Sequence, residues 1–299
     1  MTTPARTAAT LQARLNVLWA TGMQRGDSVG WDRLDEFYTV APGLVSVVTG
    51  WPGSGKSEWV DACAVNLVRQ GWAFAFYSPE NYPIEVHLSK LVEKWLGKPF
   101  GRGPTPRMTP DAATEAAAEI GDRVAFIDGG EDALDIGQII QRAGEHFAAL
   151  GHDGKHALVI DPWNEVRHTR EPGETETDYI SAALGFVRRW SRATGVHVFI
   201  VAHPAKQPRE QGKLPVPRPD MIAGSQNWWN KADQAVTVWR DYDAANNEVE
   251  IHVQKVRFKH HGRIGTVALR YDRVTGTYSE PDTDSEGREV VYSLARAKA

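Results

Sequence analysis

Along the first two thirds of the chain, the spacing of apolar residues alternates between the period of a strand and that of a helix. Short β-branched or aromatic runs predict buried strands at 44–49, 73–77, 124–127, 157–160 and 196–202. Apolar residues at helical spacing predict helices at 58–68, 82–96, 111–120, 135–150 and 179–194. Strands separated by helices predict an α/β fold with a mostly parallel sheet covered on both faces.

The pattern changes from about residue 234. Strand-like segments joined by short turns follow at 235–240, 249–258, 265–271 and 277–278. We interpret these segments as a C-terminal antiparallel extension of the same sheet, because short turns join antiparallel neighbours whereas parallel strands need longer crossovers. One α/β domain accounts for the whole pattern.

An N-terminal helix is predicted within residues 5–21. Its apolar positions Leu11, Leu15, Leu18 and Trp19 have amphipathic spacing. Three glycines then interrupt residues 22–30, so we divide the chain into an N-terminal helix with a flexible connection (1–30) and the main domain (31–299). Such a helix packs either on a neighbouring subunit or on its own core.

The most specific motif follows the first predicted strand. Residues 50–57 read Gly-Trp-Pro-Gly-Ser-Gly-Lys-Ser and fill every position of the pattern G-x-x-x-x-G-K-[ST]. Between a strand and a helix, this pattern binds nucleoside triphosphates: glycines allow close backbone approach, and the helix N-terminus supplies positive potential. Lys56 is expected to reach the β- and γ-phosphates and Ser57 to take one Mg²⁺ position. The candidate nucleotide ligands are Gly50, Gly53, Ser54, Gly55, Lys56 and Ser57.

Two carboxylates stand at predicted strand ends. Asp161 ends the strand at 157–160, which places it beside the Mg²⁺ ion or its water shell. Glu80 follows the strand at 73–77, which we expect next to the first strand, so that Glu80 faces the γ-phosphate and can deprotonate the attacking water. The alternatives are turn chemistry for Asp161 and a favourable helix-start position for Glu80.

A histidine and a basic loop follow the strand at 196–202. His203 at this strand tip can hydrogen-bond the γ-phosphate, and the next loop carries Lys206, Arg209 and Lys213. A γ-phosphate sensor joined to a basic loop predicts coupling between hydrolysis and movement of a bound polyanion. Ordinary turn chemistry is the alternative for a lone strand-end histidine.

Composition adds few constraints. The 299 residues are 41% hydrophobic and 24% charged, with a formal net charge of −4 and one cysteine. We find no apolar run of membrane-spanning length and no signal peptide, and expect a cytoplasmic protein with no membrane partner.

Basic residues gather locally at 204–219 and 254–273, which favours a polyanion bound at a restricted place over one bound all round; solvated faces are the alternative. Trp228, Trp229 and Trp239 either stack on bases or, more commonly, pack in the core.

Together these residues resemble the helicase domain of DnaB-like replicative helicases, with most similarity to phage primase-helicases and the Twinkle type. The resemblance covers about 31–278, and its most diagnostic part is the Lys-x-Arg-Phe pattern at 255–258. In chain order it is carried by residues 50–57, Tyr77-Ser-Pro-Glu80, Val159-Ile-Asp161, Val201-Ala-His203-Pro204, Gly224-Ser225, Asp233 and Gln254-Lys-Val-Arg-Phe258. The zinc-ligand cysteines of a primase module are missing from the sequence.

The resemblance implies a RecA-like fold in a hexameric ring, with ATP and Mg²⁺ at subunit interfaces and single-stranded DNA in the central hole. It implies that Arg257 is an arginine finger for a neighbour's ATP, with Lys255 beside it. The N-terminal helix matches a linker helix that grips the adjacent subunit. It assigns phosphate and metal contacts to Lys56 and Ser57, the metal-side carboxylate to Asp161, the catalytic base to Glu80, the γ-phosphate sensor to His203, and DNA contacts to Lys206, Arg209, Lys213, Gly224 and Ser225.

The resulting hypothesis is an ATP-dependent helicase motor that translocates 5′→3′ on single-stranded DNA. Its expected partners are further copies of the chain and a separate primase or other replisome proteins, in a bacterial cytoplasm if the chain is phage-encoded. Two alternatives stay open at this point: a RecA- or RadA-like recombination or repair ATPase that forms filaments, and an ATP-gated loader without motor activity.

Overall fold

The structure is a computed structural model that describes residues 5–130, 132–151, 154–205, 214–224, 226–242 and 246–281. Within these ranges one sheet contains β1 (Val45–Thr49), β2 (Trp72–Tyr77), β3 (Val124–Phe126), β4 (Lys155–Ile160), β5 (His197–Val201), β6 (Gln234–Trp239), β7 (Glu248–Val256), β8 (Gly265–Tyr271) and β9 (Tyr278–Ser279). The α-helices are α1 (Ala8–Thr21), α2 (Asp32–Asp35), α3 (Lys56–Arg69), α4 (Ile84–Leu96), α5 (Pro110–Ile120), α6 (Ile136–Leu150), α7 (Glu176–Thr194) and α8 (Asn227–Lys231). Short 3₁₀ turns occur at Gly121–Arg123, Trp163–Glu165, Pro219–Met221 and Lys259–His261.

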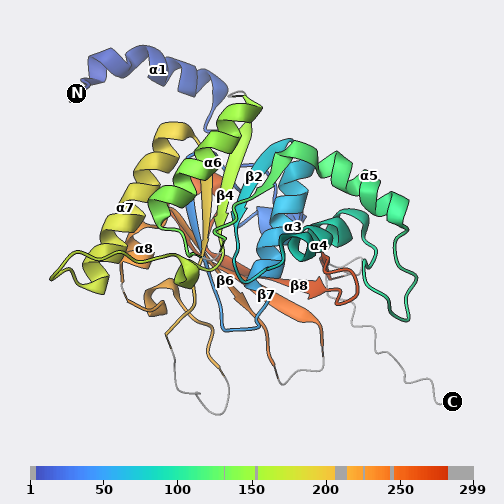
Figure 1. Ribbon diagram of the computed structural model, residues 1–299. Coiled ribbons are helices and arrows are strands. Elements are labelled where there is room, and N and C mark those ends of the chain that lie inside the picture. The colour runs from blue at the N-terminus through green and yellow to red at the C-terminus, as the bar shows by residue number, and fades with distance from the viewer. Residues whose placement is uncertain are drawn as a thin grey trace.

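The strand order is β3-β2-β4-β5-β1-β6-β7-β8-β9 (Figure 1). The first six strands in this order run parallel, and β7, β8 and β9 are antiparallel to their neighbours. The predicted α/β class is therefore confirmed. The antiparallel extension, however, begins one strand later than predicted. β6 pairs in parallel with β1 because the connection from β5, which contains α8, returns the chain to the end of the sheet where the parallel strands begin.

Helices cover both faces of the sheet, as the buried strands require. Successive strand residues point to opposite faces, so Val48 and Phe76 join one apolar cluster while Val47 and Ile160 join the other. The first cluster includes buried side chains of α3, α4 and α5, and the second includes those of α6 and α7. These helices are seen on opposite sides of the strands in Figure 1.

Helix α1 projects from one end of the molecule (Figure 1), and none of its residues is buried against the described part of the chain. Leu15 is 63% and Trp19 87% exposed. Packing of this helix on its own core, one of the two alternatives, is therefore wrong. The chain rejoins the domain at Asp27, whose backbone pairs with Val40, and Val29 is fully buried. The division of the chain at residue 30 stays a prediction.

None of the helices in the described ranges is long and apolar enough to cross a membrane.

His197 on β5 predicts a pH dependence of folding stability. Its ring is fully buried, with Nδ1 2.9 Å from the Ala41 carbonyl oxygen and Nε2 3.1 Å from the Ser46 hydroxyl. Burial lowers the pKa of His197 to about 4, against about 6.5 in an unfolded chain. Between these values the unfolded state binds more protons, so stability falls as the pH falls.

At pH 5 the expected loss from His197 is about 2 kcal/mol relative to pH 7, at about 1.4 kcal/mol per pH unit. Urea unfolding at the two pH values measures it. His197→Gln should remove about 2 kcal/mol of the difference. An unchanged difference in this variant would show that His197 is not the responsible group.

Candidate nucleotide-binding site

The glycine-rich turn lies between β1 and the start of α3, as the motif requires. Gly50, Gly53 and Gly55 all have positive φ (154°, 74° and 96°), a conformation that other residues rarely adopt. At Gly50 an added Cβ would also lie 2.3 Å from the Val238 carbonyl oxygen. The turn leads directly into the N-terminus of α3 at Lys56, whose positive potential favours an anion there.

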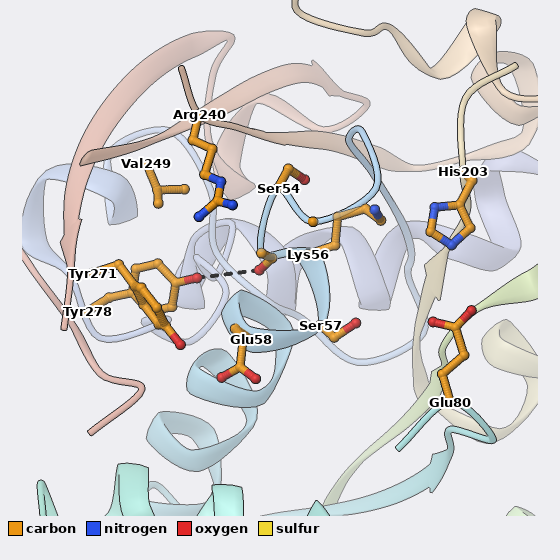
Figure 2. Close-up of a pocket in the computed structure, with 12 residues that line it drawn as sticks. Ser54, Lys56, Ser57, Glu58, Glu80, His203, Arg240, Val249, Tyr271 and Tyr278 are labelled. Atoms are coloured by element: carbon orange, nitrogen blue, oxygen red, sulfur yellow. Dashed lines mark hydrogen bonds between the residues drawn. The ribbon is translucent and has the colours of Figure 1, made fainter. Parts of the chain in front are cut away.

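A cavity of about 320 Å³ opens at this point (Figure 2). It lies at the carboxyl ends of the parallel strands, the usual ligand position in open α/β sheets. It is lined by Gly53, Ser54, Gly55, Lys56, Ser57, Glu58, Glu80, His203, Arg240, Val249, Tyr271 and Tyr278. All the predicted phosphate ligands except Gly50 therefore share one cavity with Glu80 and His203, whereas Gly50 and Asp161 are not among the residues that line it.

Lys56 is only 5% exposed. Its Nζ donates to the carbonyl oxygens of Gly50 (2.9 Å) and Trp51 (3.1 Å). Burial lowers the pKa of Lys56 to about 8, and the nearby carboxylates of Asp161 and Glu80 oppose this shift. The Lys56 ammonium would bind a phosphate oxygen more strongly than it binds these neutral carbonyl oxygens, because a hydrogen bond between two charged groups is stronger than one to a neutral acceptor.

Asp161 directly follows β4 and is 4% exposed. Burial raises its pKa to about 6, although a hydrogen bond with the Ser57 side chain stabilises the charged form. The Ser57 hydroxyl and this carboxylate are oxygen donors of the kind Mg²⁺ takes. In the described ranges no group of three or more His, Cys, Asp or Glu side chains could hold a metal. An ion at Ser57 and Asp161 therefore needs phosphate oxygens and water to complete its coordination, which fits nucleotide-bound Mg²⁺.

Glu80 lines the cavity, but the strand that precedes it has a different position in the sheet from the one predicted. We expected β2 beside β1, but β5 and β4 lie between them. Glu80 still lines the cavity, because all the parallel strands end at the same edge of the sheet. In Figure 2 its carboxylate lies on the same side of Lys56 as His203.

His203 follows β5, the strand next to β1. The buried Nδ1 of its ring has no hydrogen-bond partner among the described residues. Burial and, to a smaller extent, the charge of Lys56 together lower the pKa of His203 to about 4. The ring is therefore neutral at pH 7, and His203 lines the cavity, while its role as a γ-phosphate sensor stays a prediction.

Sequence reasoning missed the other end of the cavity. Figure 2 shows Tyr271, Tyr278 and Arg240 on the side of the phosphate loop away from Glu80. The two tyrosine rings lie 5.0 Å apart, and the Tyr278 hydroxyl donates to the Gly55 carbonyl oxygen at 3.3 Å. Their strands follow β6 in the sheet, and local periodicity does not reveal which strands lie beside the phosphate loop.

Arg257 lies at the end of the sheet opposite this cavity, where the parallel strands begin. It follows β7, which runs antiparallel to β6 and ends beside Gln234, where β6 begins. Its Nε forms an ion pair with the fully buried Asp233 (2.8 Å), and its guanidinium also donates to the carbonyl oxygens of Asn230 and Ala232 (both 3.0 Å). Arg257 therefore faces away from the cavity of its own chain.

Lys255 lies on β7 near Arg257. Its Nζ donates to the carbonyl oxygens of Trp229 and Asn230 and lies 5.8 Å from the centre of the Trp229 ring. Burial lowers the pKa of Lys255 to about 8. Lys255 and Arg257 are thus both attached to the end of α8.

Most of the predicted DNA contacts, Lys206, Arg209, Lys213 and Ser225, lie outside the described residues. Gly224 is described, and its carbonyl oxygen accepts a hydrogen bond from Thr177 Oγ1 (2.8 Å). Trp228 is fully buried and packs against Trp163, so base stacking by Trp228 is excluded. Trp229 is half-buried between Arg218 and Lys255, whose charged groups lie 5.5 and 5.8 Å from its ring.

The sheet, its glycine-rich turn and the cavity define an α/β phosphate-loop domain of the RecA-like class. Two solved structures share this fold. One, described as an ATPase domain, gives a TM-score of 0.75 at 18% identity, covering 92% of this chain and 98% of that one. A DnaB-like replicative helicase, described with its interactions with primase, gives 0.77 at 17% identity, covering 93% and 69%. The RadB recombinase is less similar, with a TM-score of 0.55 at 15% identity, covering 85% and 99%.

Sequence comparison leads to the same group. The chain is 40% identical over 269 residues to the Twinkle homolog protein, chloroplastic/mitochondrial, of Arabidopsis thaliana. The match covers 87% of this chain but only 37% of the relative. No protein-family model matches the chain. The chain is a helicase-like ATPase domain of the DnaB and Twinkle type.

Proposed function

We propose that this domain hydrolyses ATP at interfaces between copies of the chain and uses the energy to move along single-stranded DNA. The observation that carries the proposal is the position of Arg257, which lies at the end of the sheet where the parallel strands begin, opposite the cavity of its own chain. If Arg257 stabilises the transition state of hydrolysis, it does so in the cavity of another copy. Such a head-to-tail contact closes into a ring when the rotation permits, and we propose the hexameric ring implied by the sequence resemblance.

The cavity residues divide the reaction between them. Lys56 binds the β- and γ-phosphates, and Ser57 and Asp161 hold the Mg²⁺ side of the nucleotide. Mg²⁺, when bound, supplies positive charge that offsets the negative charge of the phosphates. Glu80 orients the attacking water and accepts its proton, and the neutral His203 ring contacts the γ-phosphate. Arg257 of the neighbouring copy stabilises the charge that develops on the transferred phosphoryl group.

We assign the aromatic end of the cavity to the nucleotide base. Tyr271 and Tyr278 present ring surfaces there, and Arg240 adds a planar guanidinium that stacks on aromatic rings. A base placed on this side leaves the triphosphate beside Lys56 and the γ-phosphate near Glu80 and His203.

The exposed apolar side chains of α1 support assembly. Leu15 and Trp19 remain in solvent in the single chain, so a neighbouring copy that covers them removes apolar surface from water. We propose that α1 is the linker helix between subunits. Translocation in the 5′→3′ direction, a separate primase or other replisome proteins as partners, and a cytoplasmic location belong to the same proposal and rest on the resemblance alone.

DNA contact through the basic loop is tested by the salt dependence of binding. Each phosphate contact on a single strand should contribute about −0.7 to the slope of log K against log salt concentration. Replacing Lys206, Arg209 and Lys213 together by alanine should therefore make the slope shallower by about 2. Fluorescence anisotropy with labelled oligo-dT at several salt concentrations measures it.

The exposed basic residues Lys98, Arg102 and Arg107 provide a matched control. Their triple alanine variant carries the same charge change at a different surface and should keep the parent slope. Equal slopes in the parent and the loop variant would remove the loop from the DNA contacts.

A further inference from the structure

The segment 214–219, here called the strap, has fewer backbone hydrogen-bond donors than acceptors. Three of its six residues are prolines, which carry a carbonyl oxygen but no N–H group. Extended proline-rich backbone makes no internal hydrogen bonds, so its carbonyl oxygens need donors from elsewhere. Pro217 and Pro219 are nevertheless buried, which means that the strap is seated on the domain.

Side chains of the sheet and the phosphate loop supply these donors. Trp51 Nε1 donates to the Pro215 carbonyl oxygen at 2.7 Å, and Trp239 Nε1 donates to that of Leu214 at 3.3 Å. The Pro217 carbonyl oxygen accepts from Thr237 Oγ1 (2.8 Å) and from Gln254 Nε2 (3.1 Å). The strap therefore contacts the phosphate loop, β6 and β7 together.

Trp51 differs from the other donors because it also contacts the nucleotide-binding lysine. Its carbonyl oxygen accepts from Lys56 Nζ at 3.1 Å, while its indole holds the strap. The side chain is 5% exposed, so its position is closely constrained. A phosphate group in the cavity competes with the Trp51 carbonyl oxygen for Lys56, because a charged oxygen is the stronger acceptor. A change at Lys56 thus acts directly on the residue that holds the strap.

The strap also belongs to the loop proposed to contact DNA. This loop starts immediately after His203, where Ala205 N donates to the Met221 carbonyl oxygen (2.8 Å) and Pro204 pairs with Ile222. Lys213, a proposed DNA contact, directly precedes Leu214. A displacement of the strap therefore reaches the DNA-contacting segment without passing through the core.

We propose that Trp51 is a positioning residue that links nucleotide binding at Lys56 to the strap, and through it to the affinity for single-stranded DNA. The proposal rests on the proposed function, since it requires that the domain binds both ligands. Its alternative is that the Trp51 indole only satisfies a buried donor, as buried tryptophans usually do. The two differ in a measurable quantity, the coupling between the two ligands.

The coupling factor is the ratio of the oligo-dT dissociation constants without and with a non-hydrolysable ATP analogue and Mg²⁺. By linkage, the analogue's affinity changes by the same factor when oligo-dT is added, which gives an internal check. Allosteric coupling factors are commonly about 5–150. Trp51→Phe keeps an aromatic ring but removes the indole N–H, and should lower the factor about three- to tenfold, the value of one hydrogen bond.

Trp95→Phe is the matched control. It removes an indole that donates to the Glu119 carboxylate, away from the cavity, and should keep the parent coupling factor. Pro215→Gly is a second test, because it keeps the carbonyl acceptor but loosens the strap, and it should also lower the factor. If Trp51→Phe does not fold, Pro215→Gly decides.

Three results separate the possibilities. A lowered factor in Trp51→Phe, with the parent factor in Trp95→Phe, supports the link. Where Trp51→Phe does not fold, a lowered factor in Pro215→Gly supports the link and a parent-like factor there overturns it. A parent-like factor in the folded Trp51→Phe overturns the role of Trp51 and leaves the proposed function standing. A coupling factor of one in the parent protein overturns both the link and a motor that couples ATP to DNA.

Discussion

Replacing Arg257 by alanine is expected to lower ATP turnover by about 10³–10⁵-fold, the usual contribution of an arginine finger. Nucleotide binding should be kept, because Arg257 lies at the edge of the sheet opposite the cavity of its own chain. The fold should also survive, since Arg188 and Arg192 still form ion pairs with the buried Asp233, at 3.3 and 3.6 Å. Steady-state turnover and fluorescent-nucleotide binding on the same preparation measure the two effects.

A mixing experiment tests whether Arg257 acts on another copy. Lys56→Ala removes the phosphate ligand but keeps Arg257, and Arg257→Ala does the reverse. Each variant alone should be inactive, while mixed assemblies should regain part of the activity, because some interfaces then join an intact cavity to an intact arginine. Arg192→Ala, which also removes a partner of Asp233, is the control for a structural effect and should stay active. Parent-level turnover in Arg257→Ala would contradict the assignment.

Glu80→Gln is expected to lower turnover by about 10²–10⁴-fold, the usual contribution of a general base. The amide keeps the size of the side chain but cannot accept the proton of the attacking water. Binding of ATP should be kept, because Lys56, Ser57 and Asp161 are unchanged. The variant should therefore accumulate the ATP-bound state, which rapid-quench analysis of bound nucleotide detects.

Glu85→Gln is the matched control for this prediction. Glu85 lies at the exposed start of α4, so the same chemical change there should leave turnover at the parent value. If Glu80→Gln hydrolyses ATP as fast as the parent, Glu80 is only a residue at the start of the helical segment.

Much of the cavity could be predicted from sequence for a topological reason. Asp161, His203 and Glu80 all closely follow parallel strands, and the carboxyl ends of parallel strands meet at one edge whatever the strand order. Glu80 therefore lines the cavity although β2 is separated from β1 by two strands. Its catalytic role remains a prediction.

The rest of the cavity depends on pairings between distant segments. Tyr278 meets the phosphate loop only because β7, β8 and β9 continue the sheet beyond β6, and periodicity does not specify that order. The parallel direction of β6 was missed for the same reason. The contact between Trp51 and Pro215 joins residues 164 positions apart, so a tryptophan inside the phosphate loop had no evident role in the sequence.

We propose that ATP is hydrolysed at interfaces between copies and that hydrolysis is coupled to single-stranded DNA. The most direct measurement is ATP turnover with and without oligo-dT across a range of protein concentrations. We predict that turnover per chain rises cooperatively with concentration and is strongly stimulated by oligo-dT, because Arg257 reaches an active site only in the assembly. Turnover per chain that is independent of both protein concentration and DNA would contradict the account.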